Sequence, residues 1–339
     1  MKNKIPDFAY HMTKFFTEYL PIQRNLSPNS IATYRDTFRL LLLFYDTEKH
    51  IKPNLLTLDM LDVQGIEDFM LWLKKERNCG ASTCNQRLGA LKSFFRYLQF
   101  ALPDRALQCQ ENLAIRPMKQ SEPGLKYLTI DGIKLLLEQP DIKTKYGRRD
   151  LAILSLMYDT GARVQEIADI KIVHIRFSAP ATIRITGKGD KTRVVPLLSR
   201  TEDILKQYIK DFKIDAGGND AYLFQNRNGQ HLSRFGISYI LTKYADKARK
   251  VHPELIPERL SPHCIRHSKA MHPLQANVNL VYIRDLLGHS SVTTTEIYAR
   301  ADTTLKREAL EKANPIKDTP AMPQWNDDEG LMEWLRTLI

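Results

Sequence analysis

Four segments in the first 100 residues carry apolar side chains at helical spacing. They run over residues 6–20, 28–45, 63–77 and 82–100. Apolar residues at intervals of three and four predict helices that each bury one face. Ser27 followed by Pro28 predicts an N-cap and a first helical turn at the start of the second segment. Residues 1–115 are therefore expected to form a helical domain in which the apolar stripes serve core packing.

Residues 116–124 break this periodicity with two prolines and a glycine, which predicts an extended linker. Residues 125–314 are expected to form a second, mixed domain. Two β-branched runs, 181–186 and 192–197, flank Gly187-Lys-Gly-Asp-Lys and predict a hairpin. The predicted fold is mainly α with a small β-hairpin. Its helices are expected near 130–138, 146–160, 163–170, 201–213, 232–250, 261–276, 279–287, 291–299 and 303–313.

The last segment, residues 315–339, is rich in Pro and Asp and ends in apolar residues from Leu331 to Ile339. These apolar residues are too few to fold alone. We expect residues 324–339 to dock on a neighbouring protomer in a cyclic, heterologous contact. Docking on their own domain is the alternative.

The chain is basic, with 50 Lys and Arg against 39 Asp and Glu and a formal charge of +11. Such a surface favours a polyanion, although charge alone is weak evidence for nucleic-acid binding. Five cations on the predicted N-terminal helices are candidates for phosphate contact, and a solvated helix face would account for them equally well. They are Arg35, Arg39, Arg87, Lys92 and Arg96.

The sequence shows neither a cysteine framework nor a membrane or secretory segment. The four cysteines lack Cys-x-x-Cys spacing, so neither a disulfide framework nor a cysteine zinc site is indicated. No apolar run approaches the eighteen residues of a membrane span, and the start has no secretory apolar region. The sequence therefore predicts a protein of the reducing cytoplasm.

Six polar side chains in the second domain together suit phosphoryl transfer. Two guanidinium groups can clamp phosphate oxygens and an imidazole can add a donor, which stabilises the charge that builds during attack. A tyrosine can serve as the nucleophile, and a lysine can protonate the leaving oxygen. Each residue alone has an ordinary structural explanation, and their conjunction in this order carries the hypothesis. The set is Arg163, Lys188, His263, Arg266, His289 and Tyr298.

The stretches around these residues resemble the tyrosine recombinase family, which is also the phage-integrase or Xer-like family. They are Thr160-Gly-Ala-Arg-Val-Gln-Glu-Ile, Gly187-Lys-Gly-Asp-Lys-Thr-Arg-Val-Val-Pro-Leu, Ser261-Pro-His-Cys-Ile-Arg-His and Leu286-Leu-Gly-His-Ser-Ser-Val-Thr-Thr-Thr-Glu-Ile-Tyr. The resemblance spans about 8–312 and is strongest in 125–312. It implies a helical core-binding domain followed by a catalytic domain. It also implies a site-specific enzyme that cleaves and rejoins duplex DNA through a 3′-phosphotyrosine.

The resemblance also implies a role for each residue. Arg163 and Arg266 would bind the scissile phosphate, with His289 as a further donor. His263 would assist proton transfer with the nucleophile Tyr298, and Lys188 would protonate the 5′-oxygen. Glu166 would support the site from behind, and Lys191 and Arg193 would touch backbone phosphate. Four protomers would act on two DNA sites without metal, nucleotide or other cofactor.

Two positions depart from the family pattern. Pro273 stands where leucine is common, inside the helix that begins near His263, and an interior proline removes a hydrogen bond. Asn277 replaces the usual glycine, and asparagine tolerates a left-handed helix end. Both departures concern geometry after Arg266 and neither removes a reacting group.

Other classes of function fit less well. A metal site at His263, Cys264, His267 and His272 lacks the Glu of a His-Glu-x-x-His motif, and His267 is expected to be a buried, hydrogen-bonded histidine. Gly187-Lys-Gly lacks the spacing of a nucleotide-binding loop. A non-catalytic DNA-binding protein and a type IB topoisomerase remain alternatives. A covalent adduct would exclude the first, and strand exchange between duplexes would exclude the second.

Overall fold

The computed structural model describes residues 7–120, 124–187, 189–214, 218, 220–289, 291–301, 330 and 336–337. The chain divides into two compact units, residues 1–123 and 124–339, and the division falls inside the segment expected to be a linker. Lys188, the helix expected at 303–313 and nearly all of the tail 315–339 lie outside the described residues.

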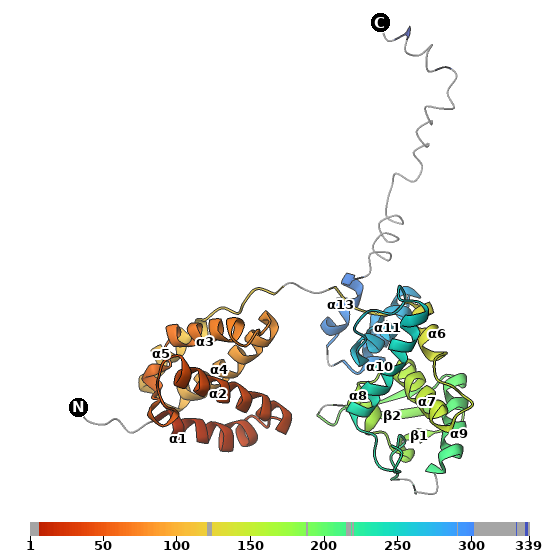
Figure 1. Ribbon diagram of the computed structural model, residues 1–339, viewed down its shortest axis with the longest axis horizontal. Coiled ribbons are helices and arrows are strands. Elements are labelled where there is room, and N and C mark those ends of the chain that lie inside the picture. The colour runs from red at the N-terminus through yellow and green to blue at the C-terminus, as the bar shows by residue number, and fades with distance from the viewer. Residues whose placement is uncertain are drawn as a thin grey trace, which may run out of the picture. The chain divides into compact units, whose positions relative to one another are not determined.

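The first unit is built from helices (Figure 1), and aromatic side chains form its core. Phe8, Phe15, Phe38 and Phe94 are buried, and Phe38 and Phe94 contact each other and both other rings, with centroids 5.1 to 6.4 Å apart. The Ser27 hydroxyl accepts the Ser30 N–H, as an N-cap should. The elements are α1 (Asp7–Lys14), π-helical η1 (Phe15–Gln23), α2 (Pro28–Thr47), α3 (Val63–Lys75), α4 (Ala81–Ala101) and α5 (Ala106–Ala114), with 3-10 turns Pro53–Leu55, Leu58–Met60 and Pro103–Arg105.

The four helices predicted for this unit are confirmed, with the first one passing into a π-helix at Phe15. A wider helical turn leaves room for Pro21, which lies inside it and donates no N–H. The fifth helix, α5, was not predicted. Its Asn112 amide donates to the Leu61 carbonyl, which ties α5 to the segment before α3.

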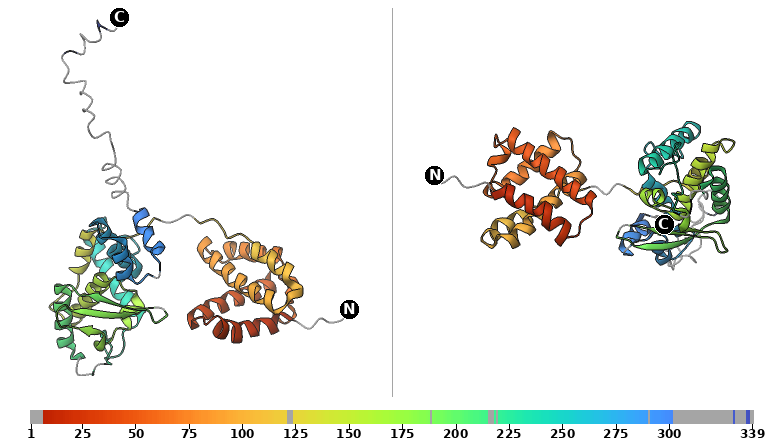
Figure 2. Two further views of the ribbon diagram at one scale, coloured as in Figure 1. Left: turned by 180° about the vertical axis from the view of Figure 1, so that it is seen from behind. Right: turned by 90° about the horizontal axis from the view of Figure 1, so that it is seen from below.

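The second unit is mixed, as expected. Its three-stranded antiparallel sheet has the order β1-β2-β3 and places Ile183 opposite Val195 on the buried face. Figure 2 shows the strands as a small sheet beside the helices of this unit. The elements are α6 (Ile130–Leu137), α7 (Lys145–Thr160), α8 (Val164–Ala168), the 3-10 turn Ile172–His174, β1 (Ile175–Arg176), β2 (Thr182–Thr186), β3 (Thr192–Pro196), α9 (Ser199–Phe212), α10 (Arg234–Val251), α11 (Pro262–Gln275), α12 (Leu280–Leu287) and α13 (Thr293–Ala301).

The expected helices and hairpin are confirmed wherever the chain is described, and the 3-10 turn Ile172–His174 and the two-residue strand β1 were not predicted. The two departures from the family pattern leave the fold intact. Helix α11 continues through Pro273 to Gln275, and Asn277 adopts φ +60°. The Val278 N–H donates to the Pro273 carbonyl at 2.9 Å and closes the helix end.

Within the described part of the chain, no helix is long and apolar enough to span a membrane. Among the same residues, no group of three or more His, Cys, Asp or Glu side chains is arranged to hold a metal ion.

Candidate active site

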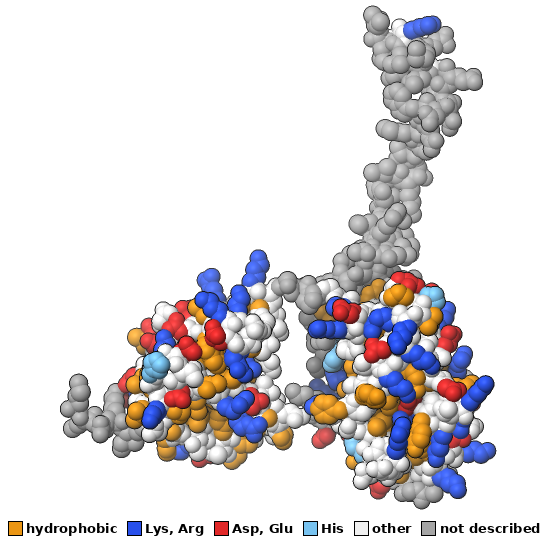
Figure 3. Space-filling view, viewed as in Figure 1, with side chains coloured by type: hydrophobic (Ala, Val, Ile, Leu, Met, Phe, Trp, Pro, Cys, Tyr) orange, Lys and Arg blue, Asp and Glu red, His pale blue; other side chains and the backbone are white. Residues whose placement is uncertain are grey.

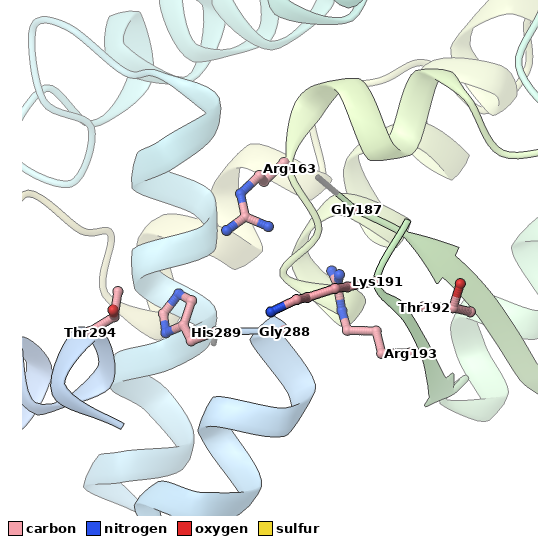
Figure 4. A pocket seen from close by; sticks show the side chains of 8 residues that line it. All are labelled: Arg163, Gly187, Lys191, Thr192, Arg193, Gly288, His289 and Thr294. Carbon is pink, nitrogen blue, oxygen red and sulfur yellow. The ribbon is translucent and has the colours of Figure 1, made fainter. Parts of the chain in front are cut away.

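A cationic cavity of about 410 Å³ lies where the hairpin meets α8 and the end of α12. Figure 4 shows Arg163, Lys191 and His289 turned toward a common space. Among the described residues, the lining contains two arginines, a lysine and a histidine but no carboxylate, so the cavity suits an anion. Its lining residues are Arg163, Gly187, Lys191, Thr192, Arg193, Gly288, His289 and Thr294.

Glu166 holds the arginines on one wall of this cavity. Arg163 is the N-cap of α8, and the buried Glu166 carboxylate accepts its backbone N–H at 3.0 Å and its Nη1 at 2.9 Å. Arg193 donates its Nη2 to the same carboxylate at 2.7 Å. Burial alone would raise the pKa of Glu166, but Arg193 and Arg163 outweigh it and hold the pKa below its ordinary value. The carboxylate is therefore charged and fixes both guanidinium groups.

Arg193 also connects the hairpin to α12. Its Nε donates to the Leu286 carbonyl at 2.9 Å, and its side chain is 11% exposed. Gly288 caps α12 at φ +67°, and a Cβ there would lie 2.9 Å from the Arg193 Nη1. Arg193, which was predicted to contact phosphate, thus also holds the hairpin against α12 through its bond to Leu286. Lys191 is exposed and lines the cavity.

Arg266 is buried behind the cavity on α11. Its Nη1 donates to the Gly161 carbonyl and its Nη2 to the Leu287 carbonyl, both at 2.7 Å. These bonds join the turn before Arg163 to the end of α12. Burial, and then the neighbouring Arg163, lowers the pKa of Arg266 to about 10. The guanidinium therefore stays charged at neutral pH.

His289 follows Gly288 directly and lines the cavity. Its Nδ1 lies 2.9 Å from the Thr295 hydroxyl. Burial, and then Arg266, lowers its pKa to about 4, so the ring is neutral at pH 7. When Nδ1 accepts from Thr295, the Nε2 carries the proton and can donate to an anion in the cavity.

Tyr298 lies on α13 and is 1% exposed. Its ring is parallel to that of His289, with the centroids 6.4 Å apart. Its Oη lies 3.0 Å from the Nδ1 of His267. Burial raises the pKa of the phenol, and Arg266 and Arg163 oppose that rise. Apolar neighbours enclose the ring: Ala270, Met271, Leu274, Ile283 and Leu287.

The structure brings Arg163, Arg266, His289 and Tyr298 together as the sequence predicted. His263 is placed differently, because it is exposed at the start of α11 with its ring centroid 6.4 Å from that of His267. The described hydrogen bond of the phenol is made with the Nδ1 of His267, which sequence reasoning expected to be a buried, hydrogen-bonded histidine. The only signal for this contact was the position of His267, immediately after Arg266.

Comparisons with known proteins agree with this geometry. Residues 126–304 match the model of the phage integrase family, and residues 14–100 match the phage integrase N-terminal SAM-like domain. The chain belongs to the phage integrase family of tyrosine recombinases. It is a site-specific DNA recombinase.

Named relatives of this recombinase span nearly its whole length. It is 35% identical to the integrase/recombinase y4rC of Sinorhizobium fredii, over 96% of this chain and 97% of the relative. It is 30% identical to the tyrosine recombinase XerD of Listeria monocytogenes, over 88% of this chain and 97% of that one. A crystal structure of a XerH recombinase with a palindromic difH substrate shares the fold. That match has a TM-score of 0.68 and 22% identity, over 93% of this chain and 92% of that one.

The cations predicted to contact DNA in the first unit of the recombinase divide into two groups. Arg35, Arg39 and Arg96 are exposed. Arg87 and Lys92 are half-buried, and the Lys92 ammonium donates to the Ile115 carbonyl at 2.5 Å. Figure 3 shows Lys and Arg side chains across the visible face of both units. The Lys92 ammonium is therefore bonded within the unit, whereas Arg35, Arg39 and Arg96 are exposed to solvent.

Proposed function

We propose that Tyr298 attacks a DNA phosphodiester held by Arg163, Arg266 and His289, and that the recombinase keeps the cleaved strand as a 3′-phosphotyrosine. The observation that carries this proposal is the position of the phenol. It lies beside a cavity whose described lining is cationic and holds no carboxylate, in a chain that matches the phage integrase family.

The cations supply the stabilisation that phosphoryl transfer needs. Negative charge builds on the phosphate oxygens as the phenol oxygen approaches phosphorus, and the guanidinium groups and the imidazole donor offset it. The bond from phosphorus to the Tyr298 Oη forms while the bond to the 5′-oxygen breaks. Lys188 would protonate that 5′-oxygen. One phosphodiester replaces another, so the strand can be rejoined without a nucleotide.

The phenol must become accessible before it reacts. It is 1% exposed and hydrogen-bonded to His267, so we infer that duplex binding displaces part of the wall around α13. Burial raises the pKa of the phenol, and this tendency weakens once phosphate and solvent enter. The same burial protects the nucleophile while no DNA is bound.

We further propose that the partner is a duplex recombination site occupied by a homotetramer, in which two pairs of protomers cleave in turn. The tail 324–339 would provide the contact in trans. The site of action would be the cytoplasm. The family match supports the recombination role, and a structural neighbour solved with its DNA substrate supports a duplex partner.

The test is capture of the covalent intermediate. Wild-type protein and Tyr298→Phe would be expressed in bacterial cells, which are lysed in strong detergent, and protein-linked DNA would be sequenced. We expect a defined DNA sequence bound covalently to the wild type and no adduct with Tyr298→Phe. Equal adduct levels for the two proteins would refute Tyr298 as the nucleophile. DNA binding without any adduct would indicate a non-catalytic protein.

A further inference from the structure

We propose that His267 accepts the proton of the Tyr298 phenol during attack and that the exposed His263 passes it to solvent. This inference rests on the proposed function and adds a catalytic residue to it. The family resemblance implies that His263 assists this proton transfer. We assign its first step to His267 instead.

The first support is contact. The His267 Nδ1 lies 3.0 Å from the Tyr298 Oη, which is within reach for direct proton transfer. The ring of His263, one helical turn earlier on α11, has its centroid 6.4 Å from that of His267. His263 is exposed whereas His267 is half-buried, so the two imidazoles run from the phenol toward solvent.

The second support is the rigid mounting of His267. It follows Arg266 on α11, and Arg266 is fixed by its bonds to the Gly161 and Leu287 carbonyls. The proposed base and one of the phosphate-binding guanidinium groups thus share one turn of a helix. A base held in this way keeps a fixed position relative to the phosphate-binding Arg266.

The third support is the ionisation of the groups around the phenol. Burial lowers the pKa of His267, and His263 and Arg266 on the same helix lower it further, so the ring is neutral and can accept a proton. Arg266 and Arg163 favour the phenolate as the proton leaves.

His289, the other imidazole beside the phenol, is less suited to this task. Its Nδ1 is engaged by the Thr295 hydroxyl. Its ring is parallel to that of Tyr298 at an interplanar angle of 7°, and its described hydrogen bond goes to Thr295 rather than to the phenol oxygen. His289 also faces the cavity, where a proton donor to phosphate is needed.

The proton balance is simple. As the Oη–phosphorus bond forms, the phenol proton moves to the His267 Nδ1, and the 5′-oxygen leaves with a proton from Lys188. Rejoining reverses both transfers. Neither an oxidant nor a metal takes part in these steps.

The experiment separates the two ends of the reaction. Single-turnover cleavage would be measured on a nicked duplex built from the captured sequence, with either oxygen or sulfur at the 5′-bridging position. A thiolate leaves without protonation, so sulfur at the 5′-bridging position should restore the cleavage rate of Lys188→Ala. His267→Gln keeps a hydrogen-bonding side chain but cannot take the proton. We expect it to be slower by about 100-fold or more on both substrates, since general-base catalysis contributes that much.

A pH profile gives the readout that a packing role would not change. The base works when neutral, so the wild-type rate should fall tenfold per unit as pH drops below the pKa of His267, which lies under 6.5. His267→Gln should lack this acid limb. Near-wild-type cleavage by His267→Gln, rescue of it by sulfur, or an acid limb that persists in it would each overturn the proposal.

Folding and the proposed function are controlled separately. If His267→Gln does not fold, His267→Ala with added imidazole decides the question. A rate that rises with imidazole concentration supports the base, and a flat rate overturns it. Absence of any adduct with the wild-type protein would instead refute the proposed function.

Discussion

At the scale of single residues, the Glu166 carboxylate is the element of the site that is easiest to test. Glu166→Gln removes the charge that holds Arg163 and Arg193, so we expect cleavage to fall at least tenfold. The free energy of unfolding should fall by about 1–3 kcal/mol, since buried charge-assisted bonds are lost. Chemical denaturation and the adduct assay measure the two effects.

The difference in the free energy of unfolding between the wild type and Glu166→Gln should depend on pH with a definite sign. The folded pKa of Glu166 lies below its ordinary value of 4.5, so its contribution is complete above that pH and is lost as pH falls through the folded pKa. The stability gap between the wild type and Glu166→Gln should therefore be constant near neutrality and narrow below about pH 4.5. A gap that widens in acid would contradict the ion-pair assignment.

Gly288 provides a second residue-scale prediction with a matched control. Gly288→Ala and Gly229→Ala both place alanine at φ near +70°, which costs about 1 kcal/mol. Only at position 288 does the new Cβ meet Arg193, at 2.9 Å. We expect Gly229→Ala to cleave normally and Gly288→Ala to lose at least tenfold in cleavage. Equal cleavage by the two variants would show that Arg193 can move without consequence.

The sequence predicted most residues of the candidate site but not all of the hydrogen bonds that they make. Arg163, Arg266, His289 and Tyr298 were recognisable because their conjunction in this order matches the motifs of the tyrosine recombinase family. The contact of His267 was not, because either imidazole of an i, i+4 pair could meet the phenol until the packing of α13 is known. The internal partner of Lys92 was hidden for the same reason, since the Ile115 carbonyl is 23 residues away in sequence.

At the scale of elements, helical periodicity predicted the long helices because each buries one continuous face. The two-residue strand β1 and the helix α5 were missed. Strand β1 is too short to show an alternating pattern, and in α5 only Cys109 and Asn112 are buried. Helix α11 gives the prediction at this scale, because it carries Arg266 and His267 and yet contains an interior proline.

Pro273→Ala should stabilise α11. Alanine restores an N–H that can donate to the Lys269 carbonyl four residues earlier and removes the ring clash, so we expect a gain of about 1–3 kcal/mol in the free energy of unfolding. Pro262→Ala, in the first turn of the same helix, should change it by less than about 0.5 kcal/mol, because no helical bond is missing there. Denaturation of both variants tests this. A loss of stability in Pro273→Ala would mean that the surrounding packing depends on the proline.

At the scale of the whole molecule, the formal charge of +11 makes DNA affinity depend on salt. The logarithm of the binding constant should fall linearly with the logarithm of salt concentration, with a slope of about −0.9 per phosphate neutralised. Of the cations predicted to contact DNA in the first unit, Arg35, Arg39 and Arg96 are exposed, whereas the ammonium of the half-buried Lys92 bonds the Ile115 carbonyl. Salt titration can therefore assign phosphate contacts to individual side chains.

The double variant Arg39→Ala/Arg96→Ala removes two exposed cations and should reduce the magnitude of the salt slope by about 2. Lys92→Ala should leave the slope unchanged but lower the free energy of unfolding by about 1 kcal/mol, because its ammonium bonds the Ile115 carbonyl. Fluorescence anisotropy on the captured DNA site, from 50 to 200 mM salt, measures the slopes, and denaturation measures stability. If Lys92→Ala flattens the slope as much as one exposed arginine does, its ammonium must leave the carbonyl for phosphate when DNA binds, and α4 reorganises in the complex.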